Sequence, residues 1–107
     1  MKVLFVCNMG MNRSPTAAKL WKELYGDETD YVGIYTAKNL KEKVKWADLI
    51  IVMEPHQRKF ISERYPKEYI KKQIICLDIP DLYSKENPEL INTLKIKFKE
   101  IKSLIPK

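Results

Sequence analysis

With 107 residues, of which 45% are hydrophobic and 32% charged, the chain is long enough to bury one core and too short for two, so we expect a single domain over residues 1–107. No apolar run approaches the roughly 20 residues that cross a bilayer, and the run at residues 3–6 is too short for a signal peptide, so we expect a cytoplasmic protein without a membrane partner. We interpret the net charge of +6 as that of a solvated surface, and the alternative is that it attracts anionic substrates. Since the basic residues do not alternate with aromatic ones, we expect no nucleic-acid partner.

Strand-like and helix-like segments alternate four times along the chain. The expected strands are apolar or β-branched runs at residues 2–6, 31–36, 48–53 and 74–77. The expected helices carry apolar stripes of helical period at residues 15–25, 40–47, 55–65 and 88–105. Ser14 is a favourable N-cap for the first helix, with Pro15 at its first position. This alternation predicts an α/β fold with one doubly wound, four-stranded parallel sheet, strand order 2-1-3-4, and helices on both faces.

The first strand–helix junction carries the strongest chemical signal in the chain. Cys7 ends a buried strand, and Arg13 and Ser14 follow it at the start of a helix. Ligands of such folds bind beyond the carboxyl ends of the strands, and the loop N–H groups and helix dipole at this place favour a thiolate and an anion. The fork of Arg13 can hold two phosphoryl oxygens, and Ser14 can donate to the sulfur. The expected phosphate-binding residues are Asn8, Met9, Gly10, Met11, Asn12 and Arg13.

Cleavage of a phosphate ester also needs an acid for the leaving oxygen, and the acid then serves as the base for water. The segment 77–83 follows the fourth strand and supplies two candidates, Asp81 as the first choice and Asp78 as the second. Their spacing does not decide between them, and one of the two can instead position Arg13 or a water. Tyr83 either lines the entrance, where it would stack on an aromatic leaving group, or packs against the last helix.

The remaining chemistry-bearing residues receive structural interpretations. Cys76 lies within an apolar strand and is expected to be inert core, and two cysteines in different segments build no disulfide framework. His56 is the only histidine and follows Pro55 at a helix start, which indicates a surface or capping role. Without a cluster at ligand spacing, we expect no metal site and no cofactor.

Taken together, the motifs resemble the low-molecular-weight protein tyrosine phosphatase family, in particular its small prokaryotic members. The shared motifs are C-x5-R-S-P-T-A at residues 7–17, A-D-L-I-x-V-M-E at 47–54, L-D-I-P-D-x-Y at 77–83 and N-P-E-L at 87–90. The resemblance covers nearly the whole chain and implies Cys7 as nucleophile, Arg13 as phosphate binder, Ser14 as thiol partner and Asp81 or Asp78 as general acid. The chain departs from the larger members at Asn12, where they often carry a second cysteine, and in the position of Gly10.

The leading hypothesis is a monomeric phosphatase that hydrolyses phosphotyrosine, in a protein or as a small aryl phosphate, through a cysteinyl-phosphate intermediate. Arsenate reduction on the same scaffold would need further reachable cysteines, and only Cys76 is present. A phosphoryl carrier is disfavoured because a carboxylate near the thiol would promote hydrolysis of the intermediate. A non-catalytic phosphopeptide-binding module remains an alternative, since binding would need only the loop.

Overall fold

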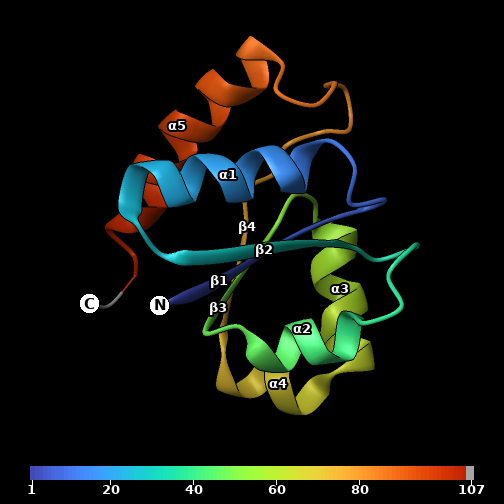
Figure 1. The fold of residues 1–107 in the computed structure, drawn as a ribbon. Coiled ribbons are helices and arrows are strands. Elements are labelled where there is room, and N and C mark those ends of the chain that lie inside the picture. Colours follow the sequence, from blue (N-terminus) through green and yellow to red (C-terminus); the bar gives the residue numbers. More distant parts are fainter. Residues whose placement is uncertain (106–107) are drawn as a thin grey trace.

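A four-stranded, all-parallel sheet forms the centre of the computed structural model, which describes residues 1–105 (Figure 1). The strands are β1 (Lys2–Cys7), β2 (Glu28–Gly33), β3 (Leu49–Val52) and β4 (Gln73–Cys76). They lie in the order β2-β1-β3-β4, and Val6 of the central strand β1 pairs with Val32 on one side and Val52 on the other. The predicted α/β class and the predicted strand order are therefore confirmed.

Helices cover both faces of this sheet, as the alternating pattern predicts. One face carries α1 (Arg13–Tyr25) and α5 (Pro88–Lys102), and the other carries α2 (Leu40–Trp46), α3 (Pro55–Arg64) and α4 (Pro66–Lys71) (Figure 1). Successive side chains of a strand point to opposite faces, so β1 contributes to both cores. Both faces of β1 and β3 are buried, which explains why their sequences are uninterrupted apolar runs.

An aromatic cluster fixes α1 and α5 against β1. The ring of Phe5 lies 5.9 Å from those of Trp21 and Phe98, which meet each other edge to face at 4.9 Å. All three side chains are fully buried. Truncating such a side chain to alanine typically costs roughly 3–5 kcal/mol, so this cluster stabilises the position of α1 relative to β1.

Several predicted boundaries differ from the structure. The second strand was expected at residues 31–36 but spans Glu28–Gly33, because its pairing with β1 begins at polar, exposed or partly buried residues of an edge strand. The helix α4 was not expected; Pro66 begins a new helix directly after Tyr65, which serves as both the end of α3 and the N-cap of α4. The last helix ends at Lys102 rather than at residue 105.

The start of α1 corrects a further prediction. Its N-cap is Asn12, whose carbonyl accepts from the backbone N–H and the hydroxyl of Thr16. Ser14 is therefore not the cap but lies in the first turn, where its side chain is free for another contact. Nowhere in residues 1–105 is there a helix long and apolar enough to cross a membrane.

Candidate active site

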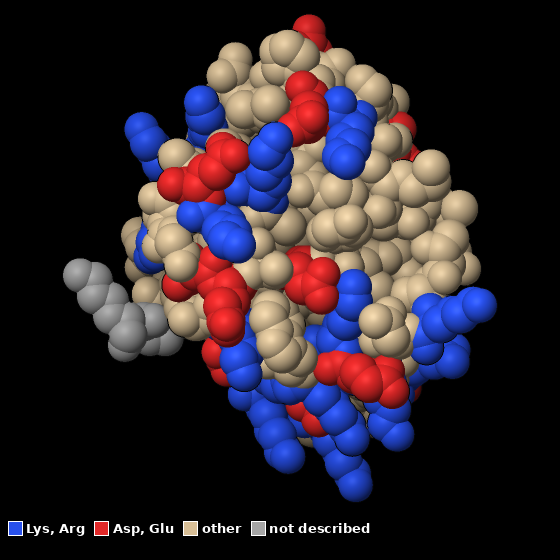
Figure 2. All heavy atoms as spheres, viewed as in Figure 1, with Lys and Arg blue, Asp and Glu red and all other residues tan. Residues whose placement is uncertain are grey.

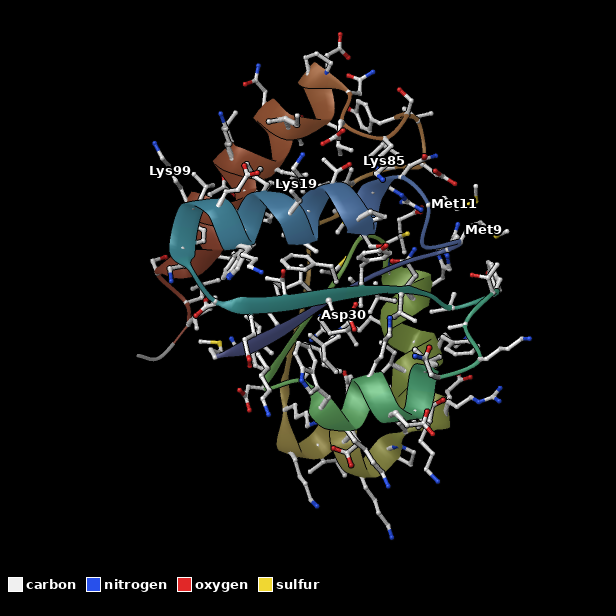
Figure 3. The ribbon with its side chains drawn as sticks, viewed as in Figure 1. Met9, Met11, Lys19, Asp30, Lys85 and Lys99 are labelled. Atoms are coloured by element: carbon white, nitrogen blue, oxygen red, sulfur yellow. The ribbon has the colours of Figure 1, made fainter. Side chains whose placement is uncertain are left out.

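The loop between β1 and α1 curls around the sulfur of Cys7 at the carboxyl edge of the sheet. It encloses a cavity of about 70 Å³ lined by Cys7, Met9, Met11, Asn12, Arg13 and Asp81. Met9 and Met11 project outward from this loop at the rim (Figure 3). The structure thus brings together the loop predicted from the first junction and one of the two acids predicted some 70 residues later, because both follow strands that end at the same edge.

Cys7 presents its sulfur to hydrogen-bond donors. The residue is only 3% exposed, and the Sγ accepts from the backbone N–H of Gly10 at 3.1 Å. The Oγ of Ser14 lies 3.0 Å from the same sulfur, and when the sulfur is a thiolate the hydroxyl must be the donor. The first turn of α1 lies next to it, with the positive end of the helix dipole. These contacts stabilise negative charge on the sulfur.

Arg13 is 1% exposed and is held by two acceptors from different elements. Its Nη1 donates to Oε1 of Glu54 at 2.5 Å and to the carbonyl of Ile79 at 2.7 Å. Since both protons of Nη1 have protein acceptors, the Nε–Nη2 edge of the guanidinium is left for the cavity. This edge is the one that can bind two oxygens of a phosphoryl group at once.

A second set of contacts fixes the first residue of the loop. The buried amide of Gln57 accepts from the backbone N–H of Met53 at 2.8 Å and of Glu54 at 2.9 Å. Its Nε2 donates to the Oδ1 of Asn8 at 2.9 Å, and the Nε2 of His56 lies 2.6 Å from the same oxygen. The side chain of Asn8 therefore ties the loop to the start of α3 and does not line the cavity.

The two candidate acids lie in different surroundings. Asp81 lines the cavity, is 53% exposed and places its Oδ1 at 3.6 Å from the Nε of Arg13. Asp78 is exposed, outside the cavity lining, and has a left-handed backbone with φ of 57°. Between them Ile79 is fully buried, and its N–H bonds to the carbonyl of Met53 at 2.8 Å, which anchors the segment. The geometry places Asp81, and not Asp78, within reach of a group bound at Arg13.

Tyr83 and Cys76 also lie outside the cavity lining, as do Gly10 and Ser14, which instead contact the sulfur of Cys7. Tyr83 is partly buried and packs against the core between the sheet and the helices α1 and α5, while its two predicted placements, at the entrance or against the last helix, stay predictions. Cys76 is only partly buried, so its assignment to the inert core needs correction. Burial nevertheless raises the pKa of the Cys76 thiol above its ordinary value, although a backbone hydrogen bond from Asp78 acts in the opposite direction.

The segment that carries Asp81 is also attached to α1 at its far end. The Nζ of Lys19, a residue labelled in Figure 3, donates to the Oε1 of Glu86 at 2.7 Å, and the backbone N–H of Glu86 donates to the hydroxyl of Thr16 at 3.0 Å. The hydrogen bond to Glu86 raises the pKa of Lys19, and the same bond lowers the pKa of Glu86. The segment between Ile79 and Glu86 is therefore anchored at both ends, with Asp81 inside it.

The comparisons with known proteins agree on one architecture. No protein-family model matches the chain, and no curated protein matches it in sequence at a significant level. Among solved structures, the Wzb tyrosine phosphatase of Escherichia coli K30 in complex with phosphate has a TM-score of 0.74 at 17% identity, and 98% of each chain is covered. The low-molecular-weight protein tyrosine phosphatase of T. tengcongensis has a TM-score of 0.71 at 20% identity, with 97% of each chain covered.

A third similar structure is the YwlE arginine phosphatase of Geobacillus stearothermophilus, with a TM-score of 0.64 at 24% identity over 96% of this chain and 86% of that one. The chain has the low-molecular-weight protein tyrosine phosphatase fold. The resemblance drawn from the motifs is thus confirmed at the level of the fold.

Within this phosphatase fold, Glu54 and Gln57 are the supporting residues that sequence reasoning missed. Both belong to the start of α3, and both act through other residues, Arg13 and Asn8. A local signal did exist for Glu54, since it is a carboxylate two residues after a buried parallel strand that ends at the same edge as β1. Among residues 1–105 no group of three or more His, Cys, Asp or Glu side chains is placed to hold a metal ion, and the expectation of a metal-free site stays a prediction.

Two glycines allow the loop between β1 and α1 to lie against β2. Gly10 has a φ of 70°, and a Cβ on it would lie 2.8 Å from the nitrogen of Gly33. A Cβ on Gly33 would lie 2.2 Å from the carbonyl carbon of Met9 and 2.5 Å from the nitrogen of Gly10. These distances are too short for non-bonded atoms, so any side chain at Gly33 must push the loop away from the sheet.

We expect Gly33→Ala to lower the free energy of unfolding by about 3 kcal/mol, because backbone on both sides of the clash must move. Thermal unfolding followed by circular dichroism would then show a melting temperature roughly 15 °C below that of the unsubstituted chain. The matched control is Gly26→Ala, where φ is 76° but nothing lies within 4 Å of the added atom, so only about 1–2 kcal/mol of backbone strain is expected. Equal melting temperatures for the two variants would contradict this explanation.

Proposed function

We propose that the chain is a phosphatase that hydrolyses phosphotyrosine or a similar aryl phosphate monoester through a cysteinyl-phosphate intermediate. The observation that supports it best is the convergence of a hydrogen-bonded sulfur, a buried guanidinium and a carboxyl group on one small cavity. A volume of about 70 Å³ suits a small tetrahedral anion and is too small for an aromatic ring in addition. The phosphoryl group would then enter the cavity, and the ring would stay at the rim.

In the first step of the proposed reaction, the thiolate of Cys7 attacks phosphorus and forms an S–P bond while the bond from phosphorus to the ester oxygen breaks. The protonated carboxyl of Asp81 transfers its proton to the departing oxygen, which leaves as the phenol. The loop N–H groups and the Nε–Nη2 edge of Arg13 receive the equatorial oxygens. Because Glu54 and the carbonyl of Ile79 already orient the guanidinium, little reorganisation is needed as charge develops.

In the second step, water attacks the phosphorus of the cysteinyl phosphate and gives a proton to the Asp81 carboxylate. The S–P bond breaks, inorganic phosphate leaves, and Cys7 returns to the thiolate. The Oγ of Ser14 at 3.0 Å can donate to the sulfur as negative charge returns to it, which makes the thiolate a better leaving group. Asp81 gives the proton that the ester oxygen needs and takes the proton that water loses, so the proposed reaction needs neither a metal nor a cofactor.

The rim of the cavity supports an aryl leaving group. The side chains of Met9 and Met11 are 47% and 63% exposed there, and both line the same small cavity, so they place apolar surface beside the bound phosphoryl group. Thioethers make favourable contacts with aromatic rings and adapt to their shape. Tyr83 lies outside the cavity lining, so this proposal assigns the ring contact to the two methionines instead.

Arsenate reduction within a single chain is disfavoured by the position of Cys76. Cys76 pairs with Val52, which pairs with Val6, so two strand spacings separate Cys76 from the end of β1. That separation is about 10 Å, beyond the roughly 7 Å between Cα atoms that a disulfide can bridge. Resolution of an adduct on Cys7 would therefore need a thiol from another molecule.

The test is the release of inorganic phosphate from three peptides of identical flanks that carry phosphotyrosine, phosphoarginine or phosphoserine. We expect kcat/KM for the phosphotyrosine peptide to exceed both others by at least about tenfold, because only its leaving group can pack on the methionine rim. Faster hydrolysis of the phosphoarginine peptide would overturn the leaving-group assignment. Binding of the phosphotyrosine peptide without any release of phosphate would instead favour the non-catalytic binding module.

A further inference from the structure

The surface has a second concave region, which takes no part in the proposed reaction. Two adjoining cavities of about 510 and 310 Å³ lie between the loop after β2, the helix α2 and the helices α3 and α4, and they share Lys41, Arg64 and Tyr65. Together they form one groove. We call it the basic groove after the cations that line it, which are Lys38, Lys41, Lys45, Arg64 and Lys67.

The basic groove carries a strong excess of positive charge. Within the described residues, none of its five cations forms an ion pair with a carboxylate. Two carboxylates line it, Glu42 and Glu68, and Glu68 is paired with Lys72 at 3.2 Å. Figure 2 shows Lys and Arg side chains gathered over the lower part of the molecule, where Figure 1 places α2 and α4. Such a surface concentrates anions and steers them toward it.

The groove begins at the same loop that supports the phosphate-binding loop. The backbone N–H of Tyr35 donates to the carbonyl of Asn8 at 3.0 Å, and the hydroxyl of Thr36 donates to the carbonyl of Met9 at 2.9 Å. The neighbouring residues Ala37 and Lys38 line the groove. One short segment therefore separates the cavity at Cys7 from the basic groove, so a chain that leaves the cavity on this side meets the cations next.

We propose that the basic groove binds an acidic segment of the polypeptide that carries the phosphorylated residue. This inference rests on the proposed function and names its substrate class, a phosphoprotein with Asp or Glu residues beside the modified side chain. Carboxylates match the fork of Arg64 and the ammonium groups of Lys38 and Lys41, which have no carboxylate partner within residues 1–105.

The same groove suits a nucleic acid poorly. Binding of single strands requires aromatic faces on which bases stack. The guanidinium of Arg64 lies over the ring of Phe60 at 5.6 Å from its centre, and Tyr65 is partly buried against the core. The carboxylate of Glu42 would also repel the continuous phosphate backbone of a nucleic acid, whereas the separate carboxylates of a peptide can be placed away from Glu42.

The binding test uses a fluorescein-labelled, unphosphorylated ten-residue peptide rich in Asp and Glu, measured by fluorescence anisotropy at low salt. The double variant Lys41→Glu/Arg64→Glu should bind it at least roughly tenfold more weakly than the unsubstituted chain, because two favourable pairs become repulsive. The matched control Lys95→Glu/Lys99→Glu makes the same change of net charge on α5, on exposed residues of the other face, and should stay within about twofold. Figure 3 labels Lys99.

Equal losses of affinity in the two double variants would mean that overall charge alone drives binding, and this would overturn the proposal that the basic groove binds the peptide. Unchanged affinity in both variants would overturn it as well. Tighter binding of a single-stranded oligonucleotide than of the peptide, abolished by Lys41→Glu/Arg64→Glu, would overturn the choice of a peptide partner. Because this assay needs no turnover, it separates the groove from the proposed function: an inactive chain that still binds the acidic peptide through the groove refutes only the reaction.

The kinetic arm compares two phosphotyrosine peptides, one with acidic and one with neutral flanks, together with phenyl phosphate. The unsubstituted chain should have a KM for the acidic peptide at least roughly fivefold below that for the neutral one, and Lys41→Glu/Arg64→Glu should remove this difference. Turnover of phenyl phosphate should be unchanged in that variant, since neither residue lines the cavity. A flank preference that survives in the variant would overturn the inference.

Discussion

Replacing Cys7 with serine is expected to lower kcat on a phosphotyrosine peptide by at least about 10⁴-fold, a loss of the size seen when other enzymes lose their nucleophile. A serine hydroxyl at this position is a far weaker nucleophile than a thiolate. Within residues 1–105, the hydrogen-bond partners of the Cys7 sulfur are the Oγ of Ser14 and the N–H of Gly10, and neither is a base that would take the proton of a hydroxyl. The measurement is phosphate release under saturating substrate, with circular dichroism to verify that the variant is folded.

The chain provides its own control for this experiment. Cys76→Ser changes the other thiol, which lies on β4, outside the cavity lining. Its kcat should stay within about twofold of the unsubstituted value. Acid quenching during turnover should also trap a phosphoryl group on the unsubstituted chain and on Cys76→Ser. Retention of more than a few per cent of the activity in Cys7→Ser would show that the attacking atom lies elsewhere.

The sequence could predict those parts of the fold that depend on a pattern within a single strand or helix. The buried strands β1 and β3 are continuous apolar runs, and α5 carries an uninterrupted stripe from Leu90 to Phe98. Right-handed crossovers then leave few possible strand orders, and the expected one is present. The edge strand β2 was displaced by three residues in the prediction, because its first half is held by pairing to β1 and not by apolar burial.

The candidate site also has a part that the sequence could predict and a part that it could not. The order of Cys7, loop and Arg13 is visible in sequence because a strand, a loop and a helix start are local features. The contacts that orient those groups are not local: Glu54 reaches Arg13 across 41 positions, and the close approach of Gly33 to Met9 follows only from the register of two strands. Ser14 illustrates the ambiguity of local signals, since it looks like a cap and instead contacts the nucleophile.

Asp81→Asn is expected to lower kcat on a phosphotyrosine peptide by roughly 10²–10³-fold, the usual contribution of a positioned acid and base. Asparagine keeps the shape of the side chain but cannot give a proton to the leaving oxygen or take one from water. Since Asp81 is about half exposed, the substitution should leave the melting temperature nearly unchanged. The matched control is Asp78→Asn, on the other predicted acid, which should change kcat by less than about threefold because Asp78 does not line the cavity.

The dependence on the leaving group separates an acid from a residue that only positions Arg13. Nitrophenol departs without protonation, so Asp81→Asn should still form the cysteinyl phosphate from nitrophenyl phosphate and then hydrolyse it slowly. Stopped-flow absorbance would show this as a burst of nitrophenol followed by a slow steady rate. If Asp81 merely orients the guanidinium, whose Nε lies 3.6 Å from its Oδ1, both phosphate affinity and the burst should weaken equally for all leaving groups. A large loss in Asp78→Asn with a small one in Asp81→Asn would reverse the assignment, and the backbone around Asp78 would then have to move toward the cavity during turnover.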